Sequence, residues 1–269
     1  MGGLDSPFSP VAAPDAKTRL AERIEQAVRR AFPDVADIQA MRDARIVLLH
    51  GLSLETWAAK ATAAVGDPAK FVTTAPSPAS MGLADYFPPP PNGDEGLTMD
   101  PHTWTDPAGY RAEAANVRDA LVRAFPESAT SLQANWQSLD ADLAGLDAAY
   151  SAGLAHCAKH EIVTNHDAYF YLAHHYNFTQ HALHGITPGG ESSQQDIQDA
   201  IDVIRSDHLG YVFLEDGTDP HAVQSIIDQT HVQVKVLSPN EERPESGDYF
   251  TRSQSNLQLL ELALECHPA

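Results

Sequence analysis

Short apolar runs alternate with segments of helical periodicity along most of the chain. The apolar runs, which are typical of buried parallel strands, lie at 46–49, 71–74, 161–164, 179–183, 211–215 and 232–237. In the second half, apolar residues at three- and four-residue spacing predict helices at 168–176, 194–206, 220–230 and 248–266. Strands separated by helices imply βαβ crossovers. We therefore expect an α/β protein with parallel sheets flanked by helices.

The longest periodic segment lies in the middle of the chain. Apolar residues recur every three or four positions from Glu127 to Leu154, which predicts one continuous amphipathic helix. Such a helix is roughly 35–40 Å long, enough to run past a whole lobe. We expect an N-terminal α/β lobe over 1–126 that is incomplete or altered, a linking helix over 127–154, and a C-terminal α/β lobe over 155–269. The cleft lies where the carboxyl ends of their strands face each other.

Three further features complete the organisation of the first half. Helices are predicted at 18–32 and 54–65, and a long loop rich in proline and glycine at 76–98. Asp106 followed by Pro107 is typical of a helix start, and this helix should run to about Ala124.

Composition and charge exclude several classes of protein. The chain has 269 residues, 37 Asp and Glu against 17 Lys and Arg, and a formal net charge of −20. Such a surface repels phosphate, so we expect no nucleic-acid partner. No apolar run reaches the roughly 18 residues that a membrane span needs. The first residues show no signal peptide, so the sequence is either cytosolic or a mature form. Cys157 and Cys266 form either one disulfide or two buried thiols.

The 13 histidines direct attention to divalent metals. His50, His102 and His166 lie at strand ends or in loops, where ligands bind in open α/β sheets. Three imidazoles and one oxygen would satisfy tetrahedral zinc. The alternative for each is a hydrogen-bonded loop histidine. Signatures of enzymes are few: the sequence contains no GxSxG elbow, P-loop or GxGxxG, and acidic residues such as Glu215 and Asp216 often end strands.

Several stretches together resemble the zinc- and manganese-specific substrate-binding proteins of ABC importers, the cluster A-I family. Residues 100–107 read Asp-Pro-His-Thr-Trp-Thr-Asp-Pro, similar to the family's Asp-Pro-His-Val-Trp-Leu-Asp-Pro. Residues 165–173 read Asn-His-Asp-Ala-Tyr-Phe-Tyr-Leu-Ala, similar to Thr-His-Asp-Ala-Phe-Gly-Tyr-Leu-Ala. The stretch from Asp37 to Glu55 and the closing pattern around 213–215 and 249–257 also match. The resemblance covers about 37–266.

The resemblance implies that His102 and His166 are metal ligands, one from each lobe. Two departures concern the other ligands. The family's first ligand, a histidine upstream of position 37, has no counterpart here, and Ser238 lies where the family often has a fourth ligand, Asp. His50, which replaces the family's usual Asn, is a candidate third ligand, and Glu215 and Glu191 are candidate oxygen donors.

The implied function is extracytoplasmic capture of zinc and its delivery to an ABC importer permease. Zinc is preferred to manganese because the candidates are nitrogen donors. We expect a periplasmic or extracellular monomer without catalytic activity; whether a removed leader carried a lipid is left open, and a Cys157–Cys266 disulfide fits this location. One alternative is a relative that binds no metal and acts as a scaffold. Another is a metallohydrolase, in which Glu215 would be essential for turnover but not for metal binding.

Overall fold

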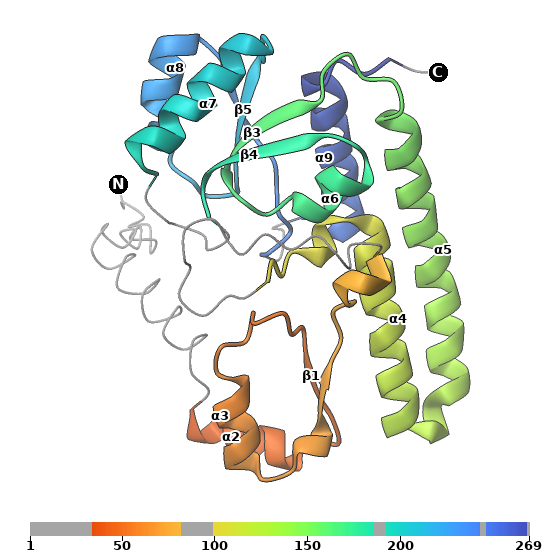
Figure 1. Ribbon diagram of the computed structural model, residues 1–269. Helices are drawn as coiled ribbons and strands as arrows, with labels where there is room; N and C mark the ends of the chain where they lie inside the picture. The colour runs from red at the N-terminus through yellow and green to blue at the C-terminus, as the bar shows by residue number, and fades with distance from the viewer. Residues whose placement is uncertain (1–33, 82–98, 186–191, 243–245, 268–269) are drawn as a thin grey trace, which may run out of the picture.

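Two parallel sheets lie at opposite ends of the computed structural model, which describes residues 34–81, 99–185, 192–242 and 246–267 (Figure 1). The strands are β1 Val47–Leu49, β2 Phe71–Thr73, β3 Glu161–His166, β4 Thr179–His184, β5 Tyr211–Leu214 and β6 Gln233–Val236. The helices are α2 Val35–Asp43, α3 Ala58–Val65, α4 Pro107–Ala124, α5 Ala129–Gly153, α6 Phe170–His175, α7 Gln194–Ser206, α8 Gln224–Thr230 and α9 Tyr249–Ala263. The α/β class with parallel sheets is confirmed. We call the β1–β2 sheet with α2 and α3 the N-terminal lobe, and the second sheet with α6–α9 the C-terminal lobe.

The sheet of the C-terminal lobe has the order β4-β3-β5-β6, with all neighbours parallel. Successive residues of a strand point to opposite faces. Ile162 accordingly belongs to one buried apolar cluster, with residues of α5, α6 and α9, while Val163 belongs to another, with residues of α7 and α8. Helices therefore cover both faces of this sheet, as the alternation of strands and helices predicts.

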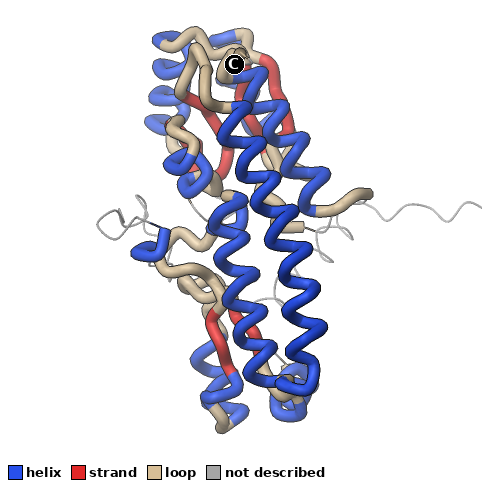
Figure 2. Tube along the Cα trace, turned by 90° about the vertical axis from the view of Figure 1, so that its right-hand side faces the viewer, coloured by secondary structure: helices blue, strands red, loops and turns tan. Residues whose placement is uncertain are grey.

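A pair of long helices joins the two lobes. Figures 1 and 2 show α5 running beside α4 and continuing along the C-terminal lobe, where Leu146 and Tyr150 enter the core. The start of α4 agrees with the prediction: the Asp106 side chain accepts a hydrogen bond from the Ala108 backbone N–H at 3.1 Å, and Pro107 is the first helical residue. Helix α5, Ala129–Gly153, lies within the 127–154 range predicted for the linking helix, and the division of the chain into two lobes and a linking helix over these ranges stays a prediction.

The N-terminal lobe, as described, is small. It contains β1 and β2, paired in parallel, and the helices α2 and α3. The hydrophobic pattern of the sequence does not indicate helix α2, because none of its residues is buried and its apolar residues do not form a clear face. Its sequence signal is the capping box, in which Asp34 and Asp37 each bind the backbone N–H of the other. The helix predicted at 54–65 begins later, at Ala58, because a turn occupies the preceding residues.

Two predicted helices of the C-terminal lobe differ from the structure in their bounds. The segment predicted as one helix at 220–230 is a 3-10 turn, Pro220–Val223, followed by α8. The last helix ends at Ala263 rather than at 266, and Cys266 is bonded to Cys157 instead. That disulfide settles the choice between a disulfide and two thiols. The helix predicted at 18–32 and most of the 76–98 loop lie outside the described residues.

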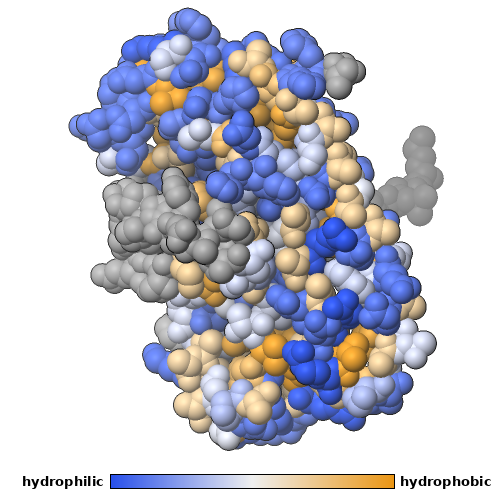
Figure 3. All heavy atoms as spheres, turned by 45° about the vertical axis from the view of Figure 1, so that its right-hand side comes forward, coloured by the Kyte–Doolittle hydropathy of each residue, from blue (hydrophilic) through white to orange (hydrophobic). Residues whose placement is uncertain are grey.

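Hydrophilic residues cover much of the face shown in Figure 3. Hydrophobic residues on this face occur singly or in small groups. None of the helices in the described part of the chain has the length and apolar character needed to cross a membrane.

Candidate metal centre

His102 lies in the segment that enters α4, immediately before the 3-10 turn Thr103–Thr105, and is 2% exposed. Asp100 fixes it from two sides, because one carboxylate oxygen accepts hydrogen bonds from the His102 backbone N–H at 2.9 Å and from ring Nδ1 at 2.7 Å. The Tyr171 hydroxyl of α6 donates to the Asp100 carbonyl at 2.7 Å. The His102 ring is therefore held with Nε2 directed away from Asp100.

His166 is the last residue of β3, an inner strand of the C-terminal sheet, and is 1% exposed. Its Nδ1 lies 3.1 Å from Glu215 Oε2, at the end of the neighbouring strand β5. Asn165 binds the same glutamate twice, donating to Oε1 at 3.1 Å and accepting from the Glu215 backbone N–H at 2.9 Å. The carboxylate thus orients the ring through Nδ1, the arrangement commonly found behind metal-ligating histidines.

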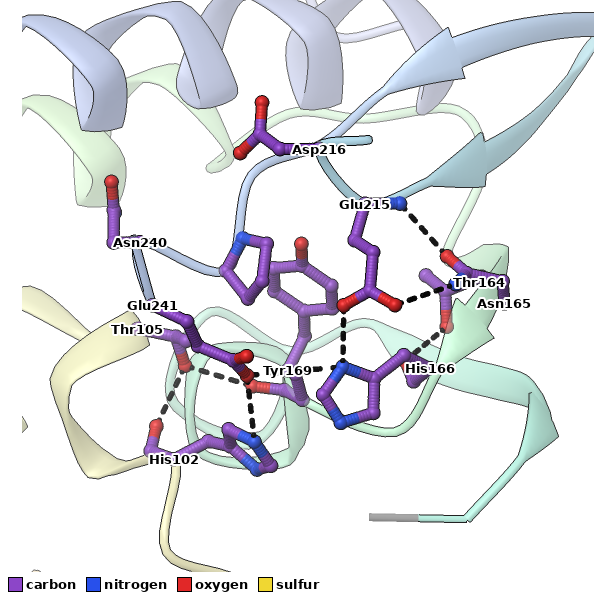
Figure 4. Close-up of polar contacts among 12 residues, drawn as sticks. His102, Thr105, Thr164, Asn165, His166, Tyr169, Glu215, Asp216, Asn240 and Glu241 are labelled. Carbon is purple, nitrogen blue, oxygen red and sulfur yellow. Dashed lines mark hydrogen bonds and ion pairs between the residues drawn. The ribbon is translucent and has the colours of Figure 1, made fainter. Parts of the chain in front are cut away.

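The two imidazoles meet at a third side chain, Glu241, in the loop that follows β6 (Figure 4). The ring centroids of His102 and His166 are 4.9 Å apart. Glu241 Oε1 lies 3.2 Å from His102 Nε2 and 3.9 Å from His166 Nδ1. One potential ligand atom from each of the three residues lies within 4.8 Å of the other two, and no other such group of histidine, cysteine or acidic residues occurs within the described ranges.

A polar network holds the loop that carries Glu241. The Trp104 indole N–H donates to the Pro239 carbonyl at 2.8 Å, which ties this loop to the segment of His102. Asn256 of α9 binds both the backbone N–H and the carbonyl of Ser238, at 3.1 and 2.7 Å. The Ser238 hydroxyl bonds to Asp216 and accepts from Arg252 at 2.9 Å. Ser238 therefore supports the loop, and the carboxylate that reaches the histidines comes three residues later.

Carboxylates dominate the electrostatics of the cluster. Burial disfavours the charged ring of His102 most strongly, but the charges and hydrogen bonds of Asp100 and Glu241 together outweigh burial and raise the pKa of His102 to about 9. Burial also acts against the Glu215 carboxylate, but the hydrogen bond and charge of His166 outweigh it and lower the pKa of Glu215. At neutral pH His102 is thus protonated in the ion-free protein, so a metal must displace a proton from it.

Of the five candidate residues named from the sequence, the structure brings His102 and His166 together. Glu215 contacts His166 from behind, in a position to orient the ring. His50 lies outside the group of three: its Nδ1 is 2.9 Å from Glu113 and its Nε2 is 2.7 Å from the Pro101 carbonyl. Glu191 is outside the described residues.

Glu241 is the residue that sequence reasoning missed. Glu241 lies in the loop after β6, at the edge of the sheet where β3 and β5 also end. Because ligands bind at the carboxyl ends of parallel strands, this position after β6 is the feature of the sequence that could have indicated a ligand. The family comparison drew attention to Ser238 instead.

The model of the family described as "Zinc-uptake complex component A periplasmic" (ZnuA) matches residues 24–263. The chain belongs to this family. Membership confirms the resemblance seen in the sequence.

Curated relatives match parts of the chain. The zinc-binding protein AdcA of Streptococcus pyogenes serotype M1 is 30% identical over 172 residues, which are 62% of this chain and 33% of AdcA. The zinc-binding lipoprotein AdcA of Streptococcus pneumoniae serotype 4 is 25% identical over 85% of this chain and 47% of its own length. The iron-binding protein YfeA of Yersinia pestis is 26% identical over 75% of this chain and 63% of YfeA. The chain thus spans between a third and a half of the AdcA proteins.

Solved structures share the fold. The laminin-binding protein Lmb of Streptococcus agalactiae, described as an adhesin with metal-transporting activity, has a TM-score of 0.71, 26% identity, and coverage of 86% of this chain and 85% of Lmb. The laminin-binding protein Lbp of Streptococcus pyogenes has a TM-score of 0.70, also with 26% identity, and coverage of 86% of both chains. These likenesses confirm the two-lobed α/β fold.

Proposed function

We propose that this protein binds zinc through His102, His166 and Glu241 and delivers it to the permease of an ABC importer. The observation that carries the proposal is the convergence of two buried imidazoles and one carboxylate within 4.8 Å, on three segments far apart in the sequence. The family description and the zinc-binding relatives support the same ion.

The donor set favours zinc over manganese. Two imidazoles and one carboxylate oxygen suit zinc, whereas manganese prefers oxygen ligands. Asp100 and Glu215 each bind Nδ1 of one histidine, so we infer that each ring coordinates the ion through Nε2. Carboxylates in these positions also increase the basicity of the coordinating nitrogen. The ion is the cargo of the protein, so binding must be tight and still reversible.

Delivery requires the site to open without unfolding the lobes. The segment of His102 and the loop of Glu241 are joined through Trp104, while His166 is built into the sheet. Because the long pair α4 and α5 links the lobes, we infer that release involves small lobe shifts and loop movement rather than wide hinge opening. A periplasmic or extracellular monomer, stabilised by the Cys157–Cys266 disulfide, fits this role.

The proposed role includes no catalysis. A metallohydrolase needs a general base beside an open position of the metal. Glu215, the candidate base, instead holds the Nδ1 side of His166 and is fixed by Asn165. Replacing Glu215 should therefore change metal binding, which separates this proposal from a hydrolase in which the same change abolishes turnover and leaves the metal bound.

Competition for zinc against a fluorescent chelator tests the proposal. The wild-type protein should take zinc from the chelator, and His102→Ala, His166→Ala and Glu241→Ala should each weaken binding by at least about 100-fold, more than the usual loss from an outer-shell change. His181→Ala is a matched control, because His181 pairs with Glu161 at 2.6 Å and lies outside the three-residue group. A wild-type protein that takes up no zinc would contradict the proposal and favour the scaffold alternative.

A further inference from the structure

We propose that His50 is a positioning residue, which holds the segment of His102 against the N-terminal lobe and so presets the metal site. The inference deepens the proposed function and depends on it. It assigns His50 a role different from the ligand role expected from the sequence.

A constrained turn presents His50 at the end of β1. Gly51, Leu52 and Ser53 have φ angles of 94°, 51° and 69°, so three successive residues adopt left-handed backbone. Such conformations are unfavourable for Leu and Ser and persist only where surrounding contacts enforce them. Glu55 holds the start of this turn, because its two carboxylate oxygens accept from the backbone N–H groups of His50 at 2.7 Å and Gly51 at 2.9 Å.

The turn also packs closely against β2. A Cβ added to Gly51 would lie 2.2 Å from the Thr73 methyl carbon, so the left-handed turn and the close approach both require glycine. The backbone at His50 is therefore fixed from two directions, by Glu55 and by the neighbouring strand.

The His50 ring connects this turn to the metal segment. Its Nε2 lies 2.7 Å from the carbonyl of Pro101, the residue that directly precedes His102. Its Nδ1 lies 2.9 Å from Glu113 of α4, and the Thr74 hydroxyl donates to the same carboxylate oxygen at 3.2 Å. A carbonyl oxygen can only accept, so Nε2 of His50 donates to Pro101, and Nδ1 is engaged by the Glu113 carboxyl group. Both ring nitrogens are therefore already in contact with groups of the protein.

Trp104 completes the connection. Its ring packs against His50 with centroids 5.0 Å apart and against His102 with centroids 5.2 Å apart. A partly buried ring bonded at both nitrogens, together with the indole beside it, restricts where the 100–104 segment can lie. Loss of His50 leaves the Pro101 carbonyl without this donor and widens the range of positions open to His102.

The test combines zinc affinity with a direct count of coordinating nitrogens. His50→Ala should weaken zinc binding by about 10- to 100-fold, the usual effect of removing a residue that orients a ligand. X-ray absorption at the zinc edge should still count two imidazoles in the variant, as in the wild type. His50→Gln keeps a side-chain N–H donor that can replace only one of the two ring contacts, so its affinity should fall between those of wild type and His50→Ala with the nitrogen count unchanged. His181→Ala again serves as the control.

Each contrary result has a distinct meaning. If His50→Ala binds zinc as tightly as wild type, or if His50→Gln is no better than His50→Ala, the positioning role is wrong and the proposed function stands. A spectrum with one imidazole fewer in His50→Ala shows that His50 is itself a ligand. Failure of the wild type to bind zinc overturns the proposed function, and the inference with it. If His50→Ala does not fold, His50→Gln decides by its affinity and nitrogen count alone.

Discussion

The two lobes of this protein place their parts of the metal site by different means. In the C-terminal lobe, His166 ends a strand whose last five residues are all buried, between two apolar clusters. Within β1, β2, α2 and α3 of the N-terminal lobe, the buried aliphatic side chains are Leu49 and Ala61. Mainly polar contacts connect that lobe to the site. Glu55 binds the backbone of His50, and the His50 ring contacts Glu113 and the carbonyl of Pro101.

This difference assigns separate duties to the two lobes. Closely packed apolar side chains are rigid and do not rearrange in small steps. Such packing suits the half of a binding site that stays fixed. Hydrogen bonds on a smaller lobe can be exchanged at lower free-energy cost, which suits the half that must release an ion. We therefore expect stability to reside mostly in the C-terminal lobe and adjustability in the N-terminal lobe.

The largest expected effect concerns the disulfide of the C-terminal lobe. Cys157 and Cys266 are 109 residues apart in sequence, so their bond removes considerable entropy from the unfolded chain. Replacing both with serine should lower the free energy of unfolding by about 2–5 kcal/mol, as measured by denaturant titration of the ion-free protein. An unchanged midpoint would show that this lobe does not set the global stability.

One leucine from each lobe compares how much the two lobes contribute to stability. Leu260 of α9 is fully buried, whereas Leu48 of β1 is 37% exposed. Leu260→Ala should cost about 2–5 kcal/mol because it creates a cavity, and Leu48→Ala should cost below about 1 kcal/mol. Equal losses in urea unfolding would contradict the proposed division of stability.

The pH dependence of zinc binding should follow His102. Its pKa is raised to about 9 in the ion-free protein, so zinc displaces one proton from this ring at neutral pH. Affinity should therefore rise by about tenfold per pH unit from pH 7 to 9 and level off above. Isothermal titration in buffers of different ionisation enthalpy measures the released proton directly.

The ion-free protein should show the opposite trend. A raised histidine pKa contributes stability below the unfolded-state value of 6.5, and this contribution is lost as the pH rises through about 9. Thermal unfolding without zinc should consequently show lower stability at pH 9 than at pH 7. In the zinc titration described above, an affinity that does not change between pH 7 and 9 would mean that His102 binds zinc without losing a proton.

The smallest expected effect is that of Glu215→Gln. The pKa of Glu215 is lowered, so the carboxylate is ionised at neutral pH. Its negative charge, next to Nδ1 of His166, should stabilise the positive charge of an ion bound to that ring. The amide retains the shape and an acceptor but not the charge, and zinc affinity should fall by about tenfold. Glu161→Gln, beside His181, is the matched control and should leave affinity unchanged. An equal loss in both variants would indicate a general effect of surface charge.

Periodicity predicted the C-terminal lobe well, because its strands are buried on both faces and its helices have clear apolar sides. Helix α7 matches its predicted range of 194–206, since Ala200, Ile201 and Ile204 form a continuous buried face. The same reasoning failed for α2, in which no residue is buried. Local capping, rather than packing, defines that helix.

The metal site could be predicted only where its ligands follow a motif. His102 and His166 lie in stretches with recognisable neighbours, whereas Glu241 lies in a loop with no pattern of its own. Its position depends on Trp104 and Asn256, which are distant in the sequence. For His50, the location at a strand end was informative, but only the structure shows that both of its nitrogens are already hydrogen-bonded.

Anomalous diffraction from crystals of the zinc-loaded protein tests the central claim most directly. The account predicts one zinc ion bonded to Nε2 of His102, to Nε2 of His166 and to a carboxylate oxygen of Glu241, at about 2.0–2.2 Å from each. An ion bound elsewhere, or bound to only one of the two histidines, would contradict it.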